Sequence, residues 1–245
     1  MPDPTPDSRA NALTSAHSSM VTATDAATGH RTLSDQAYAR LRRDVIQGAF
    51  MPGAKLGIEQ LRAAYAVGAT PLREALHRLS AEGFVVVEGQ RGFRVANISA
   101  RELRELTELR IVIEGLALRE SVERATDDWE SRVVAAFHHL QKVEKQAEPD
   151  PVLWEARNNE FHLALISQCE SRWLMRIYTL LYDQHRRYRI AARVDRGDRD
   201  IHGEHVAMME AALARDINGL LTAHEAHIRN TVRSLERRFC FEQSA

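Results

Sequence analysis

Three histidines lie on separate apolar helical stretches, each at a spacing that turns the imidazole toward the buried face. His162 follows Asn158 by one helical turn, whereas His205 and His227 lie on two later stretches. Imidazole is a favoured ligand for Zn²⁺, Ni²⁺ and similar divalent ions, and the cores of helical bundles are common places for such sites. One inward histidine is more often a hydrogen-bonded core residue. Three together favour a divalent metal site, with purely structural histidines as the alternative.

A second group of chemically active residues lies on one face of a short helix expected over residues 70–83. Thr70 is predicted to cap this helix, and Pro71 fits its first position, where the missing N–H costs nothing. Arg73, His77 and Arg78 then lie opposite an apolar face. That apolar face consists of Leu72, Ala75, Leu76 and Leu79. One side of the helix packs against the protein, and the other is free to contact a partner.

Two short β-prone runs follow this helix, at residues 84–87 and 93–95, with turn residues from Gly89 to Gly92 between them. A helix, a strand, a tight basic turn and a second strand are the layout of a winged helix. Arg73, near the start of the helix, can reach a guanine edge or a phosphate. Arg91, beside Gly92 in the turn, can enter a narrow minor groove. The alternative is an ordinary surface helix followed by a hairpin.

The spacing of apolar and capping residues predicts a mainly α fold with two parts. A helix at about 34–48, which Ser34 is predicted to cap, and another at 58–66 complete a winged helix-turn-helix within residues 31–98, and residues 1–30 read as a disordered tail. From 99 to 245 an all-helical antiparallel bundle is expected, with its first helix capped by Asn97 or Ser99. Five helices follow it at 127–147, 151–169, 171–194, 198–214 and 216–240. The apolar side of the first helix is predicted to be Leu103, Leu106, Leu109, Ile113 and Leu116.

Composition narrows the function classes. The chain has 245 residues, of which 44% are hydrophobic, and no apolar run approaches the roughly 20 residues that span a bilayer. Two cysteines are too few for a disulfide framework, so we expect a cytoplasmic protein. The net charge of −1 conceals an asymmetry, because residues 31–98 carry ten Lys and Arg against six Asp and Glu. A basic amino-terminal module joined to an acidic helical one is typical of a nucleic-acid-binding domain joined to a ligand-sensing domain.

The amino-terminal module resembles the winged helix-turn-helix of GntR-type bacterial transcription regulators. The resemblance rests on a PG turn, then TPLREAL, then RLSAEGFV, then a wing that ends in RGFRV. It implies a homodimer on a palindromic operator in double-stranded DNA, with the third helix in the major groove and the wing in the minor groove. Thr70 and Arg73 match DNA-contacting positions, and Gly92 matches the wing-tip glycine. Ala69 and Glu59 stand where many or some members have a basic residue, so the operator sequence does not transfer.

The carboxy-terminal part resembles FCD, the helical effector domain of the FadR-like subclass. The matching blocks are LRIVIEGLALR, NNEFHLAL, LYDQHRRYR, EHVAMMEAALARD and LLTAHEAHIRNT. The resemblance implies a divalent metal, Zn or Ni, held by Asn158, His162, His205 and His227. Asn158 replaces the acidic ligand of many members, and His224, one turn before His227, is the main competing ligand.

In that family the metal helps to hold a small organic acid. Arg110 matches a position that often faces this ligand, and its guanidinium would pair with a carboxylate. The alternative is an ion pair from Arg110 to Glu114, four residues later on the same helix. The LYDQHRRYR segment resembles the carbon-starvation branch of the family, which implies a dicarboxylate effector such as glutarate.

These patterns predict a transcription regulator, either a repressor or an activator, whose operator binding is controlled by a small organic acid bound at a metal site. One alternative is a metal-dependent enzyme acting on small organic acids, because three histidines with an open coordination position can activate water. The sequence has no HExxH motif, and an enzyme leaves the winged helix unexplained, so we expect no enzyme. The other alternative is a DNA-binding protein whose bundle is purely structural.

Overall fold

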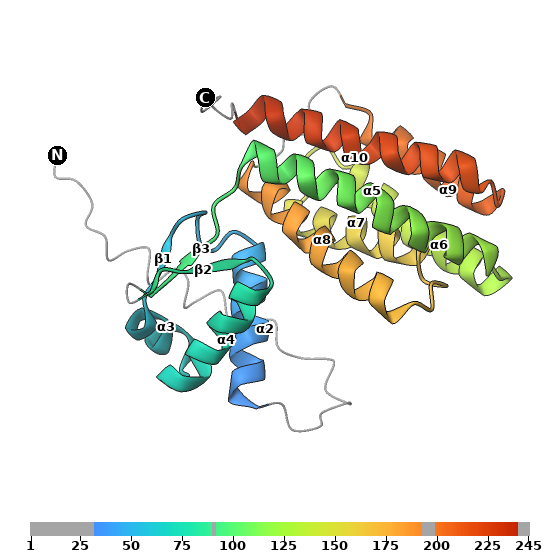
Figure 1. Cartoon of the computed structure of the whole chain (residues 1–245). Coiled ribbons are helices and arrows are strands. Elements are labelled where there is room, and N and C mark those ends of the chain that lie inside the picture. The colour runs from blue at the N-terminus through green and yellow to red at the C-terminus, as the bar shows by residue number, and fades with distance from the viewer. Residues whose placement is uncertain (1–31, 90–91, 193–198, 240–245) are drawn as a thin grey trace.

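The computed structural model describes residues 32–89, 92–192 and 199–239, which form a winged helix-turn-helix and a helical bundle (Figure 1). The first part comprises α2 (Leu33–Ile46), β1 (Lys55–Leu56), α3 (Ile58–Tyr65), α4 (Ala69–Ala81), β2 (Val85–Val87) and β3 (Phe93–Val95). The bundle comprises α5 (Ala100–Glu123), α6 (Asp127–Glu144), α7 (Pro151–Leu165), α8 (Arg172–Ala191), α9 (Ile201–Leu213) and α10 (Ile217–Phe239). The predicted fold class is confirmed, whereas the predicted tail at 1–30 lies outside the described residues.

The winged-helix part is built on α2 and α4, which pack against each other and against a small sheet. The sheet is antiparallel with the order β1-β3-β2, and Val86 of β2 pairs with Arg94 of β3. Leu41, Leu76 and Phe84 are fully buried in its core. Strand β1 was not predicted, because two residues are too few to show the alternation that marks a strand.

Two of the predicted helix starts are wrong. Helix α2 is capped by Thr32, whose side chain accepts from the Asp35 amide, rather than by Ser34. Helix α4 begins at Ala69 with Gly68 in the N-cap position, so Thr70 is its second residue and not its cap. Pro71 is therefore the third residue of α4. It is tolerated there because the first four amides of a helix have no intrahelical acceptor.

In the bundle, α5 packs against α8 and α10, while α6 packs against α7 and α9. The large apolar core contains Trp129, Leu140, Phe161 and Met208. Ser99 caps α5 as predicted, with its hydroxyl accepting from the Glu102 amide. None of the described helices is long and apolar enough to cross a membrane.

The predicted apolar side of α5 is only partly buried. Leu103 is fully buried, but Leu109 is 53% exposed and Leu116 is 49% exposed. The inward face of the helix instead carries polar groups in its middle, including Arg110 and Glu114. The prediction was wrong here because it assumed that an apolar residue is always turned toward the core, whereas Arg110 and Glu114 are buried as an ion pair that His224 of α10 completes.

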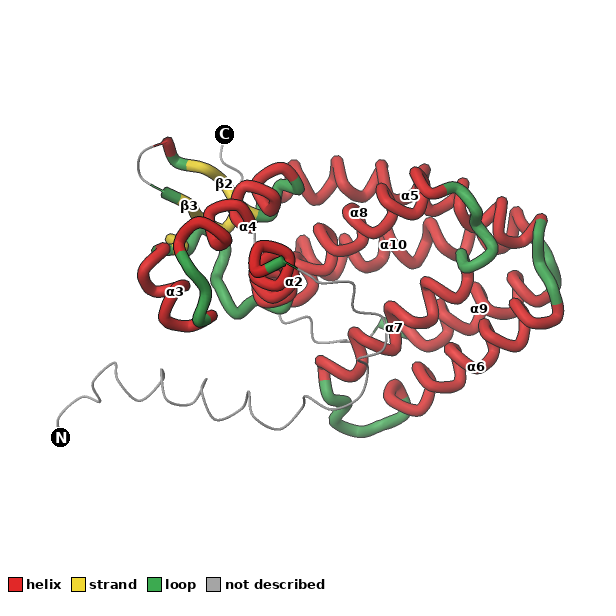
Figure 2. Tube along the Cα trace, turned by 90° about the horizontal axis from the view of Figure 1, so that it is seen from below, coloured by secondary structure: helices red, strands yellow, loops and turns green. Residues whose placement is uncertain are grey.

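Helix α8 joins the two parts. The Gln184 side-chain amide donates to the Glu82 carbonyl at 2.6 Å, just after α4, and Arg187 donates to the Ala96 carbonyl at 2.7 Å. Asp183 pairs with Arg42 of α2 at 2.7 Å. Figure 2 shows the winged-helix elements gathered at one end of the bundle, where these contacts lie. The winged-helix part is thus attached to a helix that also runs through the bundle core.

Candidate functional site: a buried histidine cluster and a basic winged helix

Three histidines from α7, α9 and α10 meet inside the bundle. One ligand-capable atom from each of His162, His205 and His227 lies within 4.8 Å of the others. All three side chains are buried, and the ring centroids of His205 and His227 are 4.9 Å apart. The three residues are far apart in the sequence, so only the packing of α7, α9 and α10 brings them together.

Two atoms of the predicted metal ligands are buried without a hydrogen-bond partner among the described residues. They are Oδ1 of Asn158 and Nε2 of His205. The Asn158 amide nitrogen is satisfied, because it donates to the Tyr182 hydroxyl at 2.9 Å. Burying a polar atom without a partner is costly, and an amide oxygen and an imidazole nitrogen are both metal ligands. The residues present therefore fit a divalent metal ion.

The electrostatics of the cluster favour neutral imidazoles. Burial, and then the proximity of the other histidines, holds the pKa of His162 well below its ordinary value. Burial, His205 and Arg199 lower the pKa of His227 in the same way. A neutral imidazole keeps a lone pair, which is what a metal ligand requires. The rings of His162 and His227 are thus ready to coordinate a cation at neutral pH without first losing protons.

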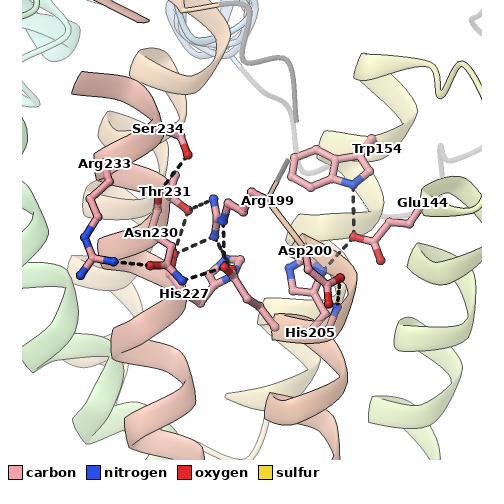
Figure 3. A network of polar contacts seen from close by, with 12 residues as sticks. Glu144, Trp154, Arg199, Asp200, His205, His227, Asn230, Thr231, Arg233 and Ser234 are labelled. Carbon is pink, nitrogen blue, oxygen red and sulfur yellow. Dashed lines mark hydrogen bonds and ion pairs between the residues drawn. The ribbon is translucent and has the colours of Figure 1, made fainter. Parts of the chain in front are cut away.

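Two carboxylates lie directly behind the cluster, and Figure 3 shows their surroundings. Glu144 lies 2.8 Å from Nδ1 of His205, and Glu204 lies 2.8 Å from Nδ1 of His227. The sequence analysis missed both. Glu204 had a signal, since it precedes His205 in the chain, but Glu144 is 61 residues away from His205 and no spacing could have indicated it.

Arg110 and Glu114 form an ion pair, which the sequence analysis gave as the alternative to ligand binding by Arg110. Nε of Arg110 donates to Glu114 at 2.6 Å, and both side chains are almost fully buried. His224 lies 2.7 Å from the other oxygen of Glu114, so its Nε2 is engaged there rather than in the histidine cluster. Burial alone would raise the pKa of Glu114, but Arg110 and His224 outweigh it and hold the pKa low.

A second buried arginine, which the sequence analysis did not single out, lies on α8. Arg189 makes two hydrogen bonds to Glu155, at 3.0 and 2.8 Å. Its guanidinium carbon is 5.2 Å from the centre of the Tyr182 ring, and that of Arg110 is 5.3 Å from the same ring. Two guanidinium groups thus flank one tyrosine whose hydroxyl bonds to Asn158. Each guanidinium is already paired with a buried carboxylate, Arg110 with Glu114 and Arg189 with Glu155.

The predicted DNA-contact residues on α4 share an exposed face. Thr70, Arg73, His77 and Arg78 are all exposed, on the side away from the buried leucines. Arg73 has no ion-pair partner among the described residues, so its guanidinium is free for a ligand. Arg78 is engaged, since it pairs with Asp35 at 2.7 Å and lies 3.9 Å over the Tyr38 ring.

The wing is partly described. Gly92 has a φ of 98°, a conformation that favours glycine, so a tight turn at this position explains the residue type. The His77 ring meets Phe93 of β3 edge-on at 5.1 Å, which ties the exposed face of α4 to the wing. Arg91, predicted to enter the minor groove, lies outside the described residues.

Comparison with known proteins settles the family. The model of bacterial regulatory proteins of the gntR family matches residues 33–95, and the FCD domain model matches residues 105–230. This chain belongs to the GntR family and carries an FCD domain. It is 39% identical to the HTH-type transcriptional regulator BphR of Paraburkholderia xenovorans over 85% of this chain and 87% of that protein.

Other relatives agree with this assignment. The HTH-type transcriptional repressor GlaR of Escherichia coli is 36% identical over 73% of this chain and 84% of that protein. The solved structure of E. coli McbR/YncC has a TM-score of 0.74 at 21% identity, covering 85% of this chain and 99% of that one, which shows the shared fold. These relatives are transcriptional regulators and not enzymes. The prediction of a GntR/FCD transcription regulator is confirmed, while the roles of the single site residues stay predictions.

The exposed arginine of α4 offers a direct test of this GntR regulator's DNA reader. We expect Arg73→Ala to weaken operator binding by about 1–3 kcal/mol, because it removes a base or phosphate contact near the start of the recognition helix. The measurement is a binding titration on the operator at fixed salt. Arg101→Ala is a matched control, since Arg101 is a highly exposed arginine on α5. Unchanged affinity in the Arg73 variant would rule out this assignment.

The histidine cluster makes a second prediction. We expect His205→Ala to abolish retention of metal after desalting, because one of three converging ligands is lost, while the apo regulator still binds DNA. Metal content by elemental analysis and operator binding of the same preparation measure the two effects. His139→Ala is the control, since that histidine is exposed and pairs with Glu160 on the surface. Wild-type metal content in the His205 variant would refute the site.

Proposed function

We propose that this regulator is a repressor whose operator binding is controlled by a small dicarboxylate held beside a divalent metal ion in the FCD domain. The observation that carries the proposal is the buried convergence of His162, His205 and His227 next to the unpartnered oxygen of Asn158. Repression is proposed from GlaR, which is named as a repressor. A bundle that is purely structural would have no use for these orphaned atoms.

The ligand set favours zinc or nickel. Three imidazoles are neutral nitrogen donors of intermediate softness, which suit these ions better than Mg²⁺ or Ca²⁺, and the amide oxygen of Asn158 adds one harder neutral donor. When bound, the ion would supply positive charge and an open coordination position for an oxygen of the effector. The chain's own residues would orient the rest of that molecule.

The two arginines beside the cluster support a dicarboxylate effector. Arg110 and Arg189 lie on either neighbouring helix, and both are paired with internal carboxylates in the absence of a ligand. An incoming carboxylate could accept charge-assisted hydrogen bonds from one of these guanidinium groups, and it would have to share that group with Glu114 or Glu155 or displace the carboxylate. Exchanging partners in this way would shift the side chains of α5 and α8.

Helix α8 supports a route from this site to the DNA reader. On one side Tyr182 and His185 lie in the bundle core, with the Tyr182 ring 6.1 Å from that of His162. On the other side Asp183, Gln184 and Arg187 contact the winged-helix part. A rotation or shift of α8 on effector binding would therefore change the position of α4 relative to the DNA. In this proposal the effector shifts an equilibrium between two ways in which the winged helix docks on α8.

Homodimerisation is supported by an exposed apolar stripe on α5. Leu109, Val112 and Leu116 recur along one face and are about half exposed, between 49% and 59%. A stripe of this kind on a helix is typical of a surface that another chain covers. A two-fold dimer would also present two α4 helices to the half-sites of a palindromic operator. We propose that residues 31–98 and 99–245 are the two domains of each protomer. We also propose that the metal site sets the distance between the two α4 helices of the dimer.

A thermal-shift screen tests the effector. We expect a dicarboxylate such as glutarate, with metal present, to raise the melting temperature by several degrees. A ligand at about a hundred times its Kd adds roughly 2.7 kcal/mol to the stability of the folded state. The same compound should lower operator affinity. Chelation should remove both effects, and a monocarboxylate of equal length is the control. Dicarboxylates that change neither melting nor DNA binding would refute the effector class, and a response unaffected by chelation would refute the metal's part in it.

The apolar stripe gives a separate prediction. We expect Val112→Glu to shift the regulator from dimer to monomer, because two copies would bury opposing carboxylates at the centre of the interface. The loss corresponds to roughly a hundredfold or more in the dimer dissociation constant, measured by sedimentation. Val134→Glu is the matched control, since Val134 is an exposed valine on α6. An unchanged dimer in the Val112 variant would place the interface elsewhere.

A further inference from the structure

Each of two ligand histidines has a carboxylate behind it, and the two carboxylates come from different elements. Glu144, the last residue of α6, lies 2.8 Å from Nδ1 of His205 on α9. Glu204 on α9 lies 2.8 Å from Nδ1 of His227 on α10. A carboxylate only accepts hydrogen bonds, so both imidazoles must carry their proton on Nδ1. The nitrogen left with a lone pair is then Nε2 in both rings.

The carboxylates are themselves held in place. Glu144 accepts from Trp154 at 3.3 Å and lies 3.0 Å from Nδ1 of His202. Glu204 is bound by Arg199 and accepts from the Asn230 amide at 2.8 Å. Figure 3 shows Glu144 beside Trp154, and Arg199 beside Thr231 and His227 of α10. Their positions are fixed by groups that do not belong to the cluster, so they can impose an orientation on the histidines.

The two carboxylates differ in how their charge is balanced. The charge of Glu204 is offset by Arg199, and Glu204 also borders an open pocket of about 600 Å³ lined by Arg199, Asn230 and Arg233. Glu144 has only a 4% exposed side chain, and in the described part of the chain its polar partners are Trp154 and the two histidines. No arginine or lysine is paired with it there. Its negative charge is the one near the cluster that lacks a permanent counter-charge.

We propose that Glu144 and Glu204 are positioning residues for the metal, and that Glu144 in addition supplies the negative charge that Asn158 does not. An aspartate at 158 would bring a formal charge into direct contact with the ion. Asn158 is neutral, so the three imidazoles and the amide leave the full charge of a divalent cation in a buried place. Glu144, one hydrogen bond beyond His205, offsets part of that charge and makes the imidazole a better donor.

This inference rests on the proposed metal site, and the decisive measurement is metal affinity with purified full-length protein. Zn²⁺ and Ni²⁺ are titrated in competition with a chromophoric chelator. We expect Glu144→Gln to weaken binding by roughly 10–100-fold, because the amide keeps a hydrogen-bond acceptor but loses the charge. Glu204→Gln should weaken it less, since Arg199 already offsets that charge. Glu160→Gln is the matched control, because Glu160 pairs with the exposed His139 at 3.3 Å, away from the cluster.

Two further measurements distinguish the proposed role in metal binding from a merely structural role. The melting temperature of the metal-free variants should stay close to wild type, whereas the rise in melting temperature on adding metal should shrink. Asn158→Asp introduced into the Glu144→Gln protein should restore most of the lost affinity, because it returns a negative charge to the site. The Tyr182 hydroxyl that now accepts from Asn158 can instead donate to the aspartate.

The outcomes are distinguishable. If wild-type protein binds neither ion, the proposed metal site itself fails. If wild type binds metal and both glutamine variants bind it equally well, the positioning role is overturned. If Glu144→Gln weakens binding but Asn158→Asp does not restore it, the charge argument is overturned. If Glu144→Gln does not fold without metal, wild-type affinity in Glu204→Gln alone overturns the positioning role.

Discussion

The arrangement of the bundle depends on one constraint, which is that polar groups buried in its centre must be satisfied by residues from other helices. Arg110, Glu114 and His224 form one such set, and Glu144 with His205 forms another. A buried charge without a partner costs several kcal/mol, so each group fixes the rotation of its own helix relative to its neighbours. The large apolar core around Trp129 supplies most of the favourable burial, while the polar sets decide which way the helices face.

This constraint explains the outer surface of the bundle as well as its interior. Because α5 must turn Arg110 and Glu114 inward, it turns Leu109, Val112 and Leu116 outward. A helix cannot bury both faces within one small bundle. The same rotation that builds the polar interior therefore leaves an apolar stripe for a second copy of the chain, so that the proposed effector site and the proposed dimer interface are opposite sides of one helix.

Helix α8 links the two parts of the chain through buried polar contacts of the same kind. Its residues alternate between the bundle core and the winged helix within two turns, from Tyr182 to Arg187. Arg187 is itself buried and satisfied by the Ala96 carbonyl, just before the chain enters α5. Such a contact is directional and short, so a small movement of α8 has to be taken up by the winged helix or break the bond. That is the physical basis for the proposed coupling of the bundle interior to DNA binding.

The sequence by itself determined the order of the helices, the winged helix with its exposed Arg73, and the inward direction of His162, His205 and His227. These follow from local rules, since caps, turns and the helical period act over a few residues. The predicted helix caps at Thr70 and Ser34 were wrong, because several possible capping residues lie within one turn. Strand β1 was missed, because two residues are too few to show an alternating pattern. The sequence offered the Arg110–Glu114 pair within α5 as one of two alternatives, and only the tertiary structure placed His224 against Glu114 and Glu144 behind His205. These are contacts between helices, and their choice depends on helix rotation, which is set by satisfying all of the buried polar groups at once and not by any one stretch of the chain.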